Sequence, residues 1–173
     1  MERQNLGEKF TVKGIILLIL IIAFMLGLFL ALINIGEPKS PATKQQVYTA
    51  LENQGLSQDD FTAGYVEEYP ALGIVSVVGY RTDDFRIEFF ELENNKFARN
   101  ITVQLNQAIL DARDITNDSE HITGMQNYYI HTYNVDDKHF WLMRIDNTVI
   151  YSFCCDDNYE KMVDVMTELG YRN

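Results

Sequence analysis

The chain has 173 residues, 47% of them hydrophobic, and a formal net charge of −11 at pH 7. The excess of negative charge lies entirely after residue 36, where 11 basic residues are outnumbered by 23 acidic ones. A domain with this excess of negative charge repels phosphate backbones and anionic headgroups, so the composition argues against nucleic-acid binding and against lying flat on an anionic membrane.

The most apolar stretch, residues 14–34, contains no charged residue and no proline. Twenty helical residues rise by roughly 30 Å, which is the thickness of the hydrocarbon core of a bilayer. Neither a small-residue cleavage site nor a lipid-attachment cysteine follows it. We therefore expect an uncleaved transmembrane anchor, with a cleaved signal peptide as the minor alternative.

The charges that flank the anchor favour one orientation. Arg3, Lys9 and Lys13 lie in the short tail of residues 1–13. Because positive charge is enriched on the cytoplasmic side, we predict a cytoplasmic tail and an extracytoplasmic C-terminal domain at the cell membrane. Residues 35–42 contain two prolines and are expected to form a short, stiff linker.

Small residues recur every fourth position inside the anchor, at Ala23, Gly27 and Ala31. In a helix these positions share one face, and small side chains allow two membrane helices to approach closely. This stripe is our candidate for a homodimer interface. The alternative is that glycine and alanine are simply common in membrane helices.

We expect residues 43–173 to form one α+β domain with an antiparallel sheet of about five strands and three or four helices. A first helix, capped by Ser40 or Thr43, ends at Gly55. Residues 56–72 fit a short helix or a strand equally well.

In the next segments apolar and polar residues alternate, as they do in a hairpin with one buried face. Strands at 73–80 and 84–92 are rich in β-branched and aromatic residues. A tight turn at 82–83 would pair Tyr80 with Phe85. This arrangement collects six apolar side chains on one face: Ile74, Val78, Tyr80, Phe85, Ile87 and Phe89.

A long amphipathic helix is predicted at 95–113, because its apolar residues recur at intervals of three and four. Asn94 or Asn95 would cap its N-terminus. The polar residues 114–125 that follow are expected to form a loop.

The last third of the chain predicts a three-stranded meander at 127–134, 138–145 and 148–155, connected by short Asp-containing turns. A capping box at 157–160 (Asp-Asn-Tyr-Glu) is then expected to begin a final helix that ends at Gly170.

The meander has two apolar faces. The favoured explanation is that helices cover both of them, and the alternative is that aromatic side chains are exposed to a partner. Four side chains are the candidates for such a partner surface: Trp141, Tyr129, Tyr133 and Phe140.

No catalytic or metal-binding motif emerges from the sequence. The histidines at 121, 131 and 139 lack the spacing of metal ligands, and no nucleophile elbow or phosphate loop is present. The adjacent Cys154 and Cys155 cannot cross-link distant parts of a fold and are interpreted as structural thiols. We predict no catalytic residue, no metal and no cofactor.

The leading hypothesis is therefore a single-pass membrane protein whose extracytoplasmic α+β domain acts as a binding or interaction module for a protein or other component of the cell envelope. The alternative is an envelope hydrolase that uses acidic residues, because Asp and Glu doublets are frequent in the chain.

Overall fold

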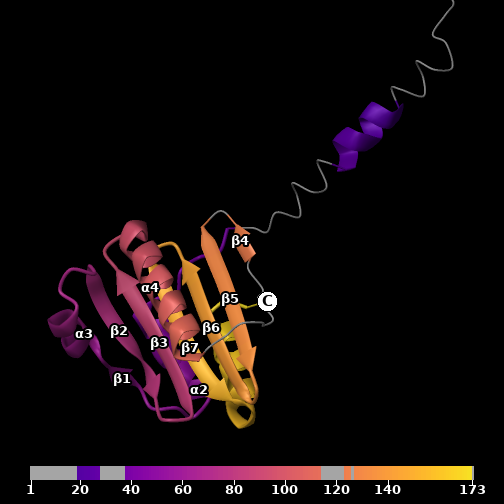
Figure 1. Cartoon of the computed structure of the whole chain (residues 1–173). Coiled ribbons are helices and arrows are strands. Elements are labelled where there is room, and N and C mark those ends of the chain that lie inside the picture. The colour runs from indigo at the N-terminus through magenta and orange to yellow at the C-terminus, as the bar shows by residue number, and fades with distance from the viewer. Residues whose placement is uncertain (1–18, 28–37, 114–122, 126, 173) are drawn as a thin grey trace, which may run out of the picture. The chain divides into compact units, whose positions relative to one another are not determined.

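The structure is a computed structural model that describes residues 19–27, 38–113, 123–125 and 127–172 (Figure 1). The chain divides into two units, Met1–Glu37 and Pro38–Asn173. In the first unit residues 19–27 are helical, and the rest of the predicted anchor lies outside the described residues. Within the described ranges, no helix combines the length and the apolar character that crossing a membrane requires.

The second unit is an α+β domain, as predicted. In chain order its elements are α2 (Lys44–Asn53), β1 (Asp59–Asp60), α3 (Thr62–Glu68), β2 (Ile74–Arg81), β3 (Phe85–Leu92), α4 (Asn95–Arg113), β4 (Thr123–Met125), β5 (Tyr128–Val135), β6 (Lys138–Ile145), β7 (Thr148–Cys155), a 3-10 turn (Asp156–Asn158) and α5 (Tyr159–Glu168).

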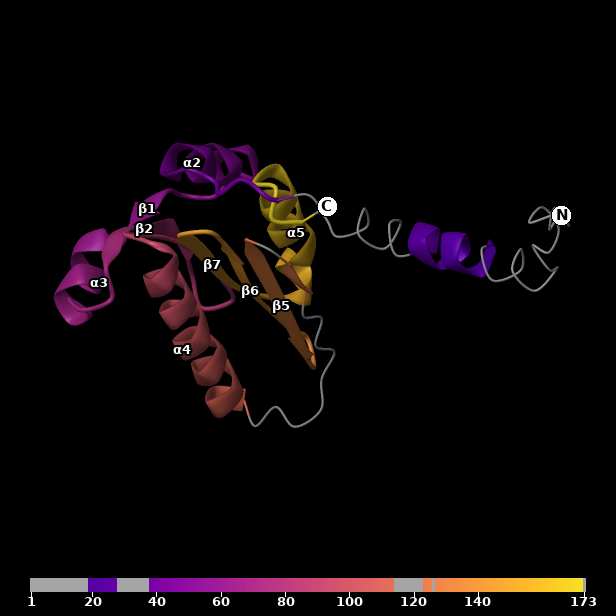
Figure 2. The ribbon, with the colours of Figure 1, turned by 90° about the horizontal axis from the view of Figure 1, so that it is seen from above.

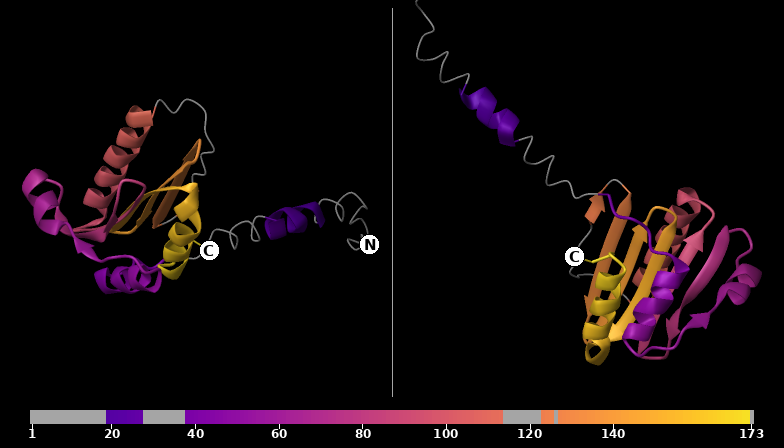
Figure 3. Two further views of the ribbon diagram at one scale, coloured as in Figure 1. Left: turned by 90° about the horizontal axis from the view of Figure 1, so that it is seen from below. Right: turned by 180° about the vertical axis from the view of Figure 1, so that it is seen from behind.

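The described strands form one antiparallel sheet in the order β1-β2-β3-β7-β6-β5-β4. Its five eight-residue strands are the five that the sequence predicts, and β1 and β4 add short strands at the two edges. Helices α2 and α5 lie on one face of the sheet and α4 lies on the other (Figures 2 and 3). The helices therefore cover both faces.

The first core lies between the sheet and helices α2 and α5. Alternate residues of β3 and β6 point into this core, and the helices contribute their apolar stripes. Its fully buried members include Leu51, Ile87, Phe89, Met143, Ile150, Met162 and Met166.

The second core lies between the opposite face of the sheet and α4. The strand residues that alternate with those of the first core point to this face and pack against the apolar stripe of α4. Tyr65 of α3 packs at the margin of this core. Its buried members include Val77, Phe90, Leu92, Ala98, Ile101, Ile109, Leu142 and Val149.

The register of the first hairpin corrects the prediction. Tyr80 pairs with Ile87 and not with Phe85, so the pairing is shifted by two residues. A shift of two preserves which side chains share a face. Only Ile74 changes face: a bulge between Ile74 and Ser76 interrupts the register, and Ile74 packs in the second core.

The helix starts confirm two predicted caps and correct a third. Thr43 and Gln46 form a reciprocal capping box, and Asn94 Oδ1 accepts a hydrogen bond from the Lys96 amide at 3.0 Å. The predicted capping box at 157–160 is wrong. A 3-10 turn occupies Asp156–Asn158, so α5 begins at Tyr159 without a side-chain cap.

Candidate functional site

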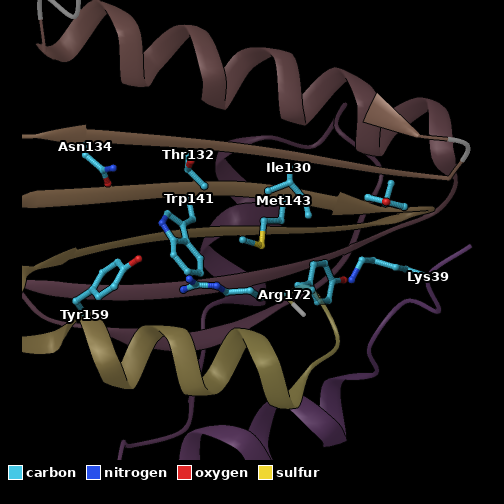
Figure 4. Close-up of a pocket in the computed structure, with 10 residues that line it drawn as sticks. Lys39, Ile130, Thr132, Asn134, Trp141, Met143, Tyr159 and Arg172 are labelled. Atoms are coloured by element: carbon cyan, nitrogen blue, oxygen red, sulfur yellow. The ribbon is translucent and has the colours of Figure 1, made fainter. Parts of the chain in front are cut away.

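A cavity of about 350 Å³ opens on the α5 side of the sheet, at strand β5, the neighbour of the short edge strand β4 (Figure 4). Its floor comes from β5 and β6, because alternate strand residues point to the same face. Its walls are formed by residues at the two ends of α5 (Tyr159, Tyr171 and Arg172) and by Lys39 at the start of the domain. We call this cavity the Trp141 pocket, and it is lined by Lys39, Tyr128, Ile130, Thr132, Asn134, Trp141, Met143, Tyr159, Tyr171 and Arg172.

The end of α5 places Arg172 in the wall of the pocket. Gly170 takes a φ of 74°, the left-handed conformation that ends many helices, and the amide of Arg172 then donates to the carbonyl of Met166 at 3.1 Å. The guanidinium lies over the ring of Trp141, with Cζ 4.8 Å from the ring centroid. This distance is within the range of a cation–π interaction.

One guanidinium nitrogen of Arg172 is buried and makes no hydrogen bond within the described structure. A buried donor without an acceptor costs about 1–3 kcal/mol. An acceptor atom of a ligand or a water molecule would remove this cost, so the arginine is suited to bind an anionic group.

Lys39 supplies the second cation. This part of the predicted linker is held against the domain by Asn127, whose side-chain amide donates to the Lys39 carbonyl at 2.6 Å and accepts from the Lys39 amide at 3.1 Å. The Lys39 ammonium donates to the carbonyl of Gly170 at 2.8 Å and lies 5.6 Å from the centroid of the Tyr128 ring. Partial burial lowers the pKa of this ammonium from its ordinary value.

The charge of the pocket is opposite to that of the domain. Two cations line it and no carboxylate does, whereas the whole chain has a net charge of −11. Four aromatic rings, two aliphatic side chains and the polar Thr132 and Asn134 complete the lining, and the rings suit a ligand with a planar portion. Apolar and aromatic walls combined with placed polar groups are typical of small-molecule binding sites.

A second polar cluster lies on the opposite face, around the fully buried Glu88. Its carboxylate pairs with the guanidinium of Arg81 and, at 2.6 Å, with that of Arg86. The Tyr65 hydroxyl donates to Glu88 at 2.9 Å and accepts from both arginines. Two positive charges against one negative charge leave this cluster with a net positive charge.

The polar groups of the described residues do not assemble a recognisable catalytic centre. Burial is the main cause that raises the pKa of the Tyr65 hydroxyl, and burial also raises the pKa of the Cys154 thiol to about 12. Neither group is an activated nucleophile. Both ring nitrogens of His139 are occupied, by Asn134 at 2.8 Å and by Asp156 at 2.7 Å.

Metal ligands are also not clustered in the described part of the chain, where no group of three His, Cys, Asp or Glu side chains is placed to hold an ion. His121 and most of the loop predicted at 114–125 lie outside the described residues.

The aromatic candidates for a partner surface belong largely to the cores. Trp141 is 4% exposed, Tyr133 3% and Phe140 1%, because helices cover both faces of the meander. Tyr129 is half-buried, and its hydroxyl lies 2.7 Å from His131 Nδ1. This burial agrees with the favoured explanation that both faces of the meander are covered, and Trp141 lies in the wall of a pocket.

The anchor candidates are described only in part. Ala23 and Gly27 belong to the helical stretch 19–27, and nothing lies within 4 Å of a Cβ built on Gly27. Ala31 lies outside the described residues.

Sequence reasoning missed the two cations of the pocket. Arg172 follows a recognisable helix stop at Gly170, but that signal does not reveal its contact with a strand 31 positions earlier. In the sequence Lys39 is a positive charge of the expected linker, on the C-terminal flank of the anchor, and no motif marks it as a pocket residue. No protein-family model, no curated protein and no solved structure matches this chain.

Proposed function

We propose that this chain is a single-pass membrane protein whose extracytoplasmic domain binds a small anionic ligand in the Trp141 pocket. The single observation that supports this function best is the pocket itself, in which Lys39 and Arg172 lie among four aromatic residues and no carboxylate side chain is part of the lining. The ligand class follows from this charge and from the ring-lined walls: an organic anion with a planar or aromatic portion.

The membrane assignment is supported by the sequence. Residues 14–34 contain no charge and are long enough to span a bilayer as a helix. Extraction of membranes with alkaline carbonate tests it. The full chain is expected to stay in the membrane pellet, and a variant that lacks residues 14–34 is expected in the supernatant. Release of the full chain would contradict the proposal.

Self-association through the anchor is the second part of the proposal, because Ala23, Gly27 and Ala31 offer a groove for a second helix. Replacement of Gly27 by Ile is expected to lower the yield of crosslinked dimer in membranes. The Leu26→Ile variant changes a neighbouring face and serves as the control. Equal dimer yields for the two variants would contradict this interface.

A thermal-shift experiment tests the ligand class with probes that share one ring. Benzoate and phenyl phosphate are expected to raise the melting temperature of the full chain in lipid nanodiscs, since a ligand that binds only the folded state stabilises it. Benzyl alcohol, which is neutral, and benzylammonium, which is cationic, are expected to have no such effect. The Lys39→Gln variant is expected to lose the response to the anions. Equal shifts with all four compounds would overturn the proposed specificity.

A further inference from the structure

A second cavity of about 350 Å³ lies on the opposite face of the sheet, between α3 and α4. We call it the α3–α4 groove. Its walls are mainly aliphatic and aromatic. The residues of the lining that carry polar groups are Tyr65, Tyr69, Arg86 and Gln104. Its apolar wall is formed by Leu72, Ile74, Phe90, Ile101 and Leu105.

The groove lies beside α3, a short helix that packs on the sheet through Tyr65 and leaves its other residues exposed or half-buried. None of the residues of α3 is buried, and Tyr65 makes an edge-on contact with the ring of Phe90 at 5.2 Å between centroids. Figure 2 shows α3 at the outer edge of the sheet, splayed away from α4. Tyr69, at the end of α3, is still 42% exposed beside this opening.

The only charged side chain among the residues that line the groove is Arg86. Its guanidinium forms an ion pair with the carboxylate of Glu88, and the same carboxylate also pairs with Arg81. Arg86 Nε is buried without a hydrogen-bond acceptor in the described structure, and the side chain remains 30% exposed. The positive charge of Arg86 is therefore only partly compensated by protein groups.

We propose that the α3–α4 groove binds a free alkyl carboxylate, with the alkyl chain against the apolar wall and the carboxylate at Arg86. The apolar wall offers an alkyl chain the same environment as the adjacent core, so burial of its methylene groups there removes apolar surface from water and is favourable. Carboxylate binding by a guanidinium is geometrically favoured because the two planar groups form paired hydrogen bonds. This site is separate from the Trp141 pocket and does not depend on the function proposed for that pocket.

Photo-crosslinking of the full chain in nanodiscs tests this site, because it reports the position as well as the occurrence of binding. The probe is a dodecanoate analogue that carries a diazirine in its alkyl chain, and mass spectrometry of peptides locates the label. Labelling is expected in the segments of α3 and α4 that line the groove. Unmodified dodecanoate is expected to compete, whereas dodecanol, with the same chain and no charge, is expected to compete at least about tenfold less well.

Two tryptophan substitutions on α4 provide a matched pair. Ala108 is exposed and lines the groove, so Ala108→Trp fills the space without disturbing the core. Val103 is 68% exposed and does not line it. Labelling of α3 and α4 is expected to fall about tenfold in Ala108→Trp and to stay unchanged in Val103→Trp. The Arg172→Gln variant, which alters the Trp141 pocket, is expected to label like the wild type.

Three results would overturn the proposal. Equal labelling of the two tryptophan variants would show that the groove is not the site. Equal competition by dodecanol and dodecanoate would show that Arg86 does not select a carboxylate. Label confined to other segments, including residues 14–34, would show that the probe partitions into the bilayer or binds elsewhere.

Discussion

The guanidinium of Arg172 lies over the indole of Trp141, with Cζ 4.8 Å from the ring centroid. This contact joins the residue that follows the stop of α5 to the middle of β6, and it closes one wall of the Trp141 pocket. Lys39 closes another wall from the opposite end of the domain sequence. Two segments that are far apart in the chain thus supply the two cations of one site.

Asn127 is expected to keep Lys39 in place, because its amide group makes two hydrogen bonds to the Lys39 backbone and one to the carboxylate of Asp146. The Asn127→Ala variant should therefore exchange its backbone amides faster in the segment around Lys39, as measured by hydrogen–deuterium exchange. The Asn53→Ala variant, which removes one exposed hydrogen bond to Glu168, is the control. Unchanged exchange around Lys39 in Asn127→Ala would contradict this role.

Glu88 is expected to stabilise the first hairpin, because its fully buried carboxylate holds both Arg81 and Arg86. The Glu88→Gln variant keeps the shape but loses charge-assisted hydrogen bonds, so the free energy of unfolding should fall by about 2 kcal/mol. Urea denaturation measures this loss. The exposed Glu67→Gln substitution on α3 should change stability by less than about 0.5 kcal/mol. Similar values for the two variants would refute the structural importance of the buried carboxylate.

The two adjacent thiols should differ in reactivity. Cys154 is buried, and burial raises its pKa to about 12, while Cys155 is partly exposed. Because the thiolate is the reactive form, N-ethylmaleimide at about pH 8 should modify Cys155 alone in the native protein. Mass spectrometry should find one adduct in the wild type, none in Cys155→Ser and one in unfolded Cys155→Ser. Rapid native modification of Cys154 would contradict the packing of β7.

Tyr171 should make the domain less stable at alkaline pH. Burial raises the pKa of its hydroxyl from 10.0 to about 12. Between these values the unfolded chain loses the proton and the folded chain retains it, so the stabilisation is complete below pH 10.0 and is lost as the pH rises towards 12.

The Tyr171→Phe variant tests this dependence by urea denaturation across the alkaline range. It removes the titrating hydroxyl together with its hydrogen bond to Thr148, so the variant should be less stable than the wild type at neutral pH but should lose less stability above about pH 10. Parallel losses in the two proteins would assign the alkaline effect to other groups.

Much of the fold was predictable because local signals and burial agree. The helix at Asn95–Arg113 has an asparagine cap and a regular apolar stripe, and the structure has the predicted bounds. The turns after β5 and β6 begin with Asp136 and Asp146, both at positive φ, a conformation that aspartate tolerates better than most residues. These two-residue connections set the register of the meander.

The prediction errors occur where one local sequence pattern is compatible with more than one backbone conformation. The bulge before Ser76 moves Ile74 to the other face, and nothing in the alternation of the strand signals it. The Asp-Asn-Tyr-Glu sequence at 157–160 resembles a helix cap, yet the chain first makes a 3-10 turn in which Asp156 pairs with His139. That pairing depends on a residue of β6 and is not visible in the local sequence.

The candidate site was not predictable, because its parts meet only in the folded chain. Lys39 is held by Asn127, 88 residues away in sequence, and Arg172 meets Trp141 through the end of α5. Trp141 itself was a candidate, although for an exposed partner surface and not for the wall of a pocket. Composition alone predicts an acidic surface and does not reveal a cationic cavity within it.

The most direct test of the proposed binding function is a fluorescence titration, because Trp141 is the only tryptophan in the chain and lines the pocket. Benzoate added to the full chain in nanodiscs is expected to change the emission in a saturable manner, and benzylammonium is not. The Arg172→Gln variant is expected to weaken the benzoate response about tenfold or more. An equal, saturable response to both compounds, or an unchanged benzoate affinity in Arg172→Gln, would contradict the assignment of the Trp141 pocket as an anion site.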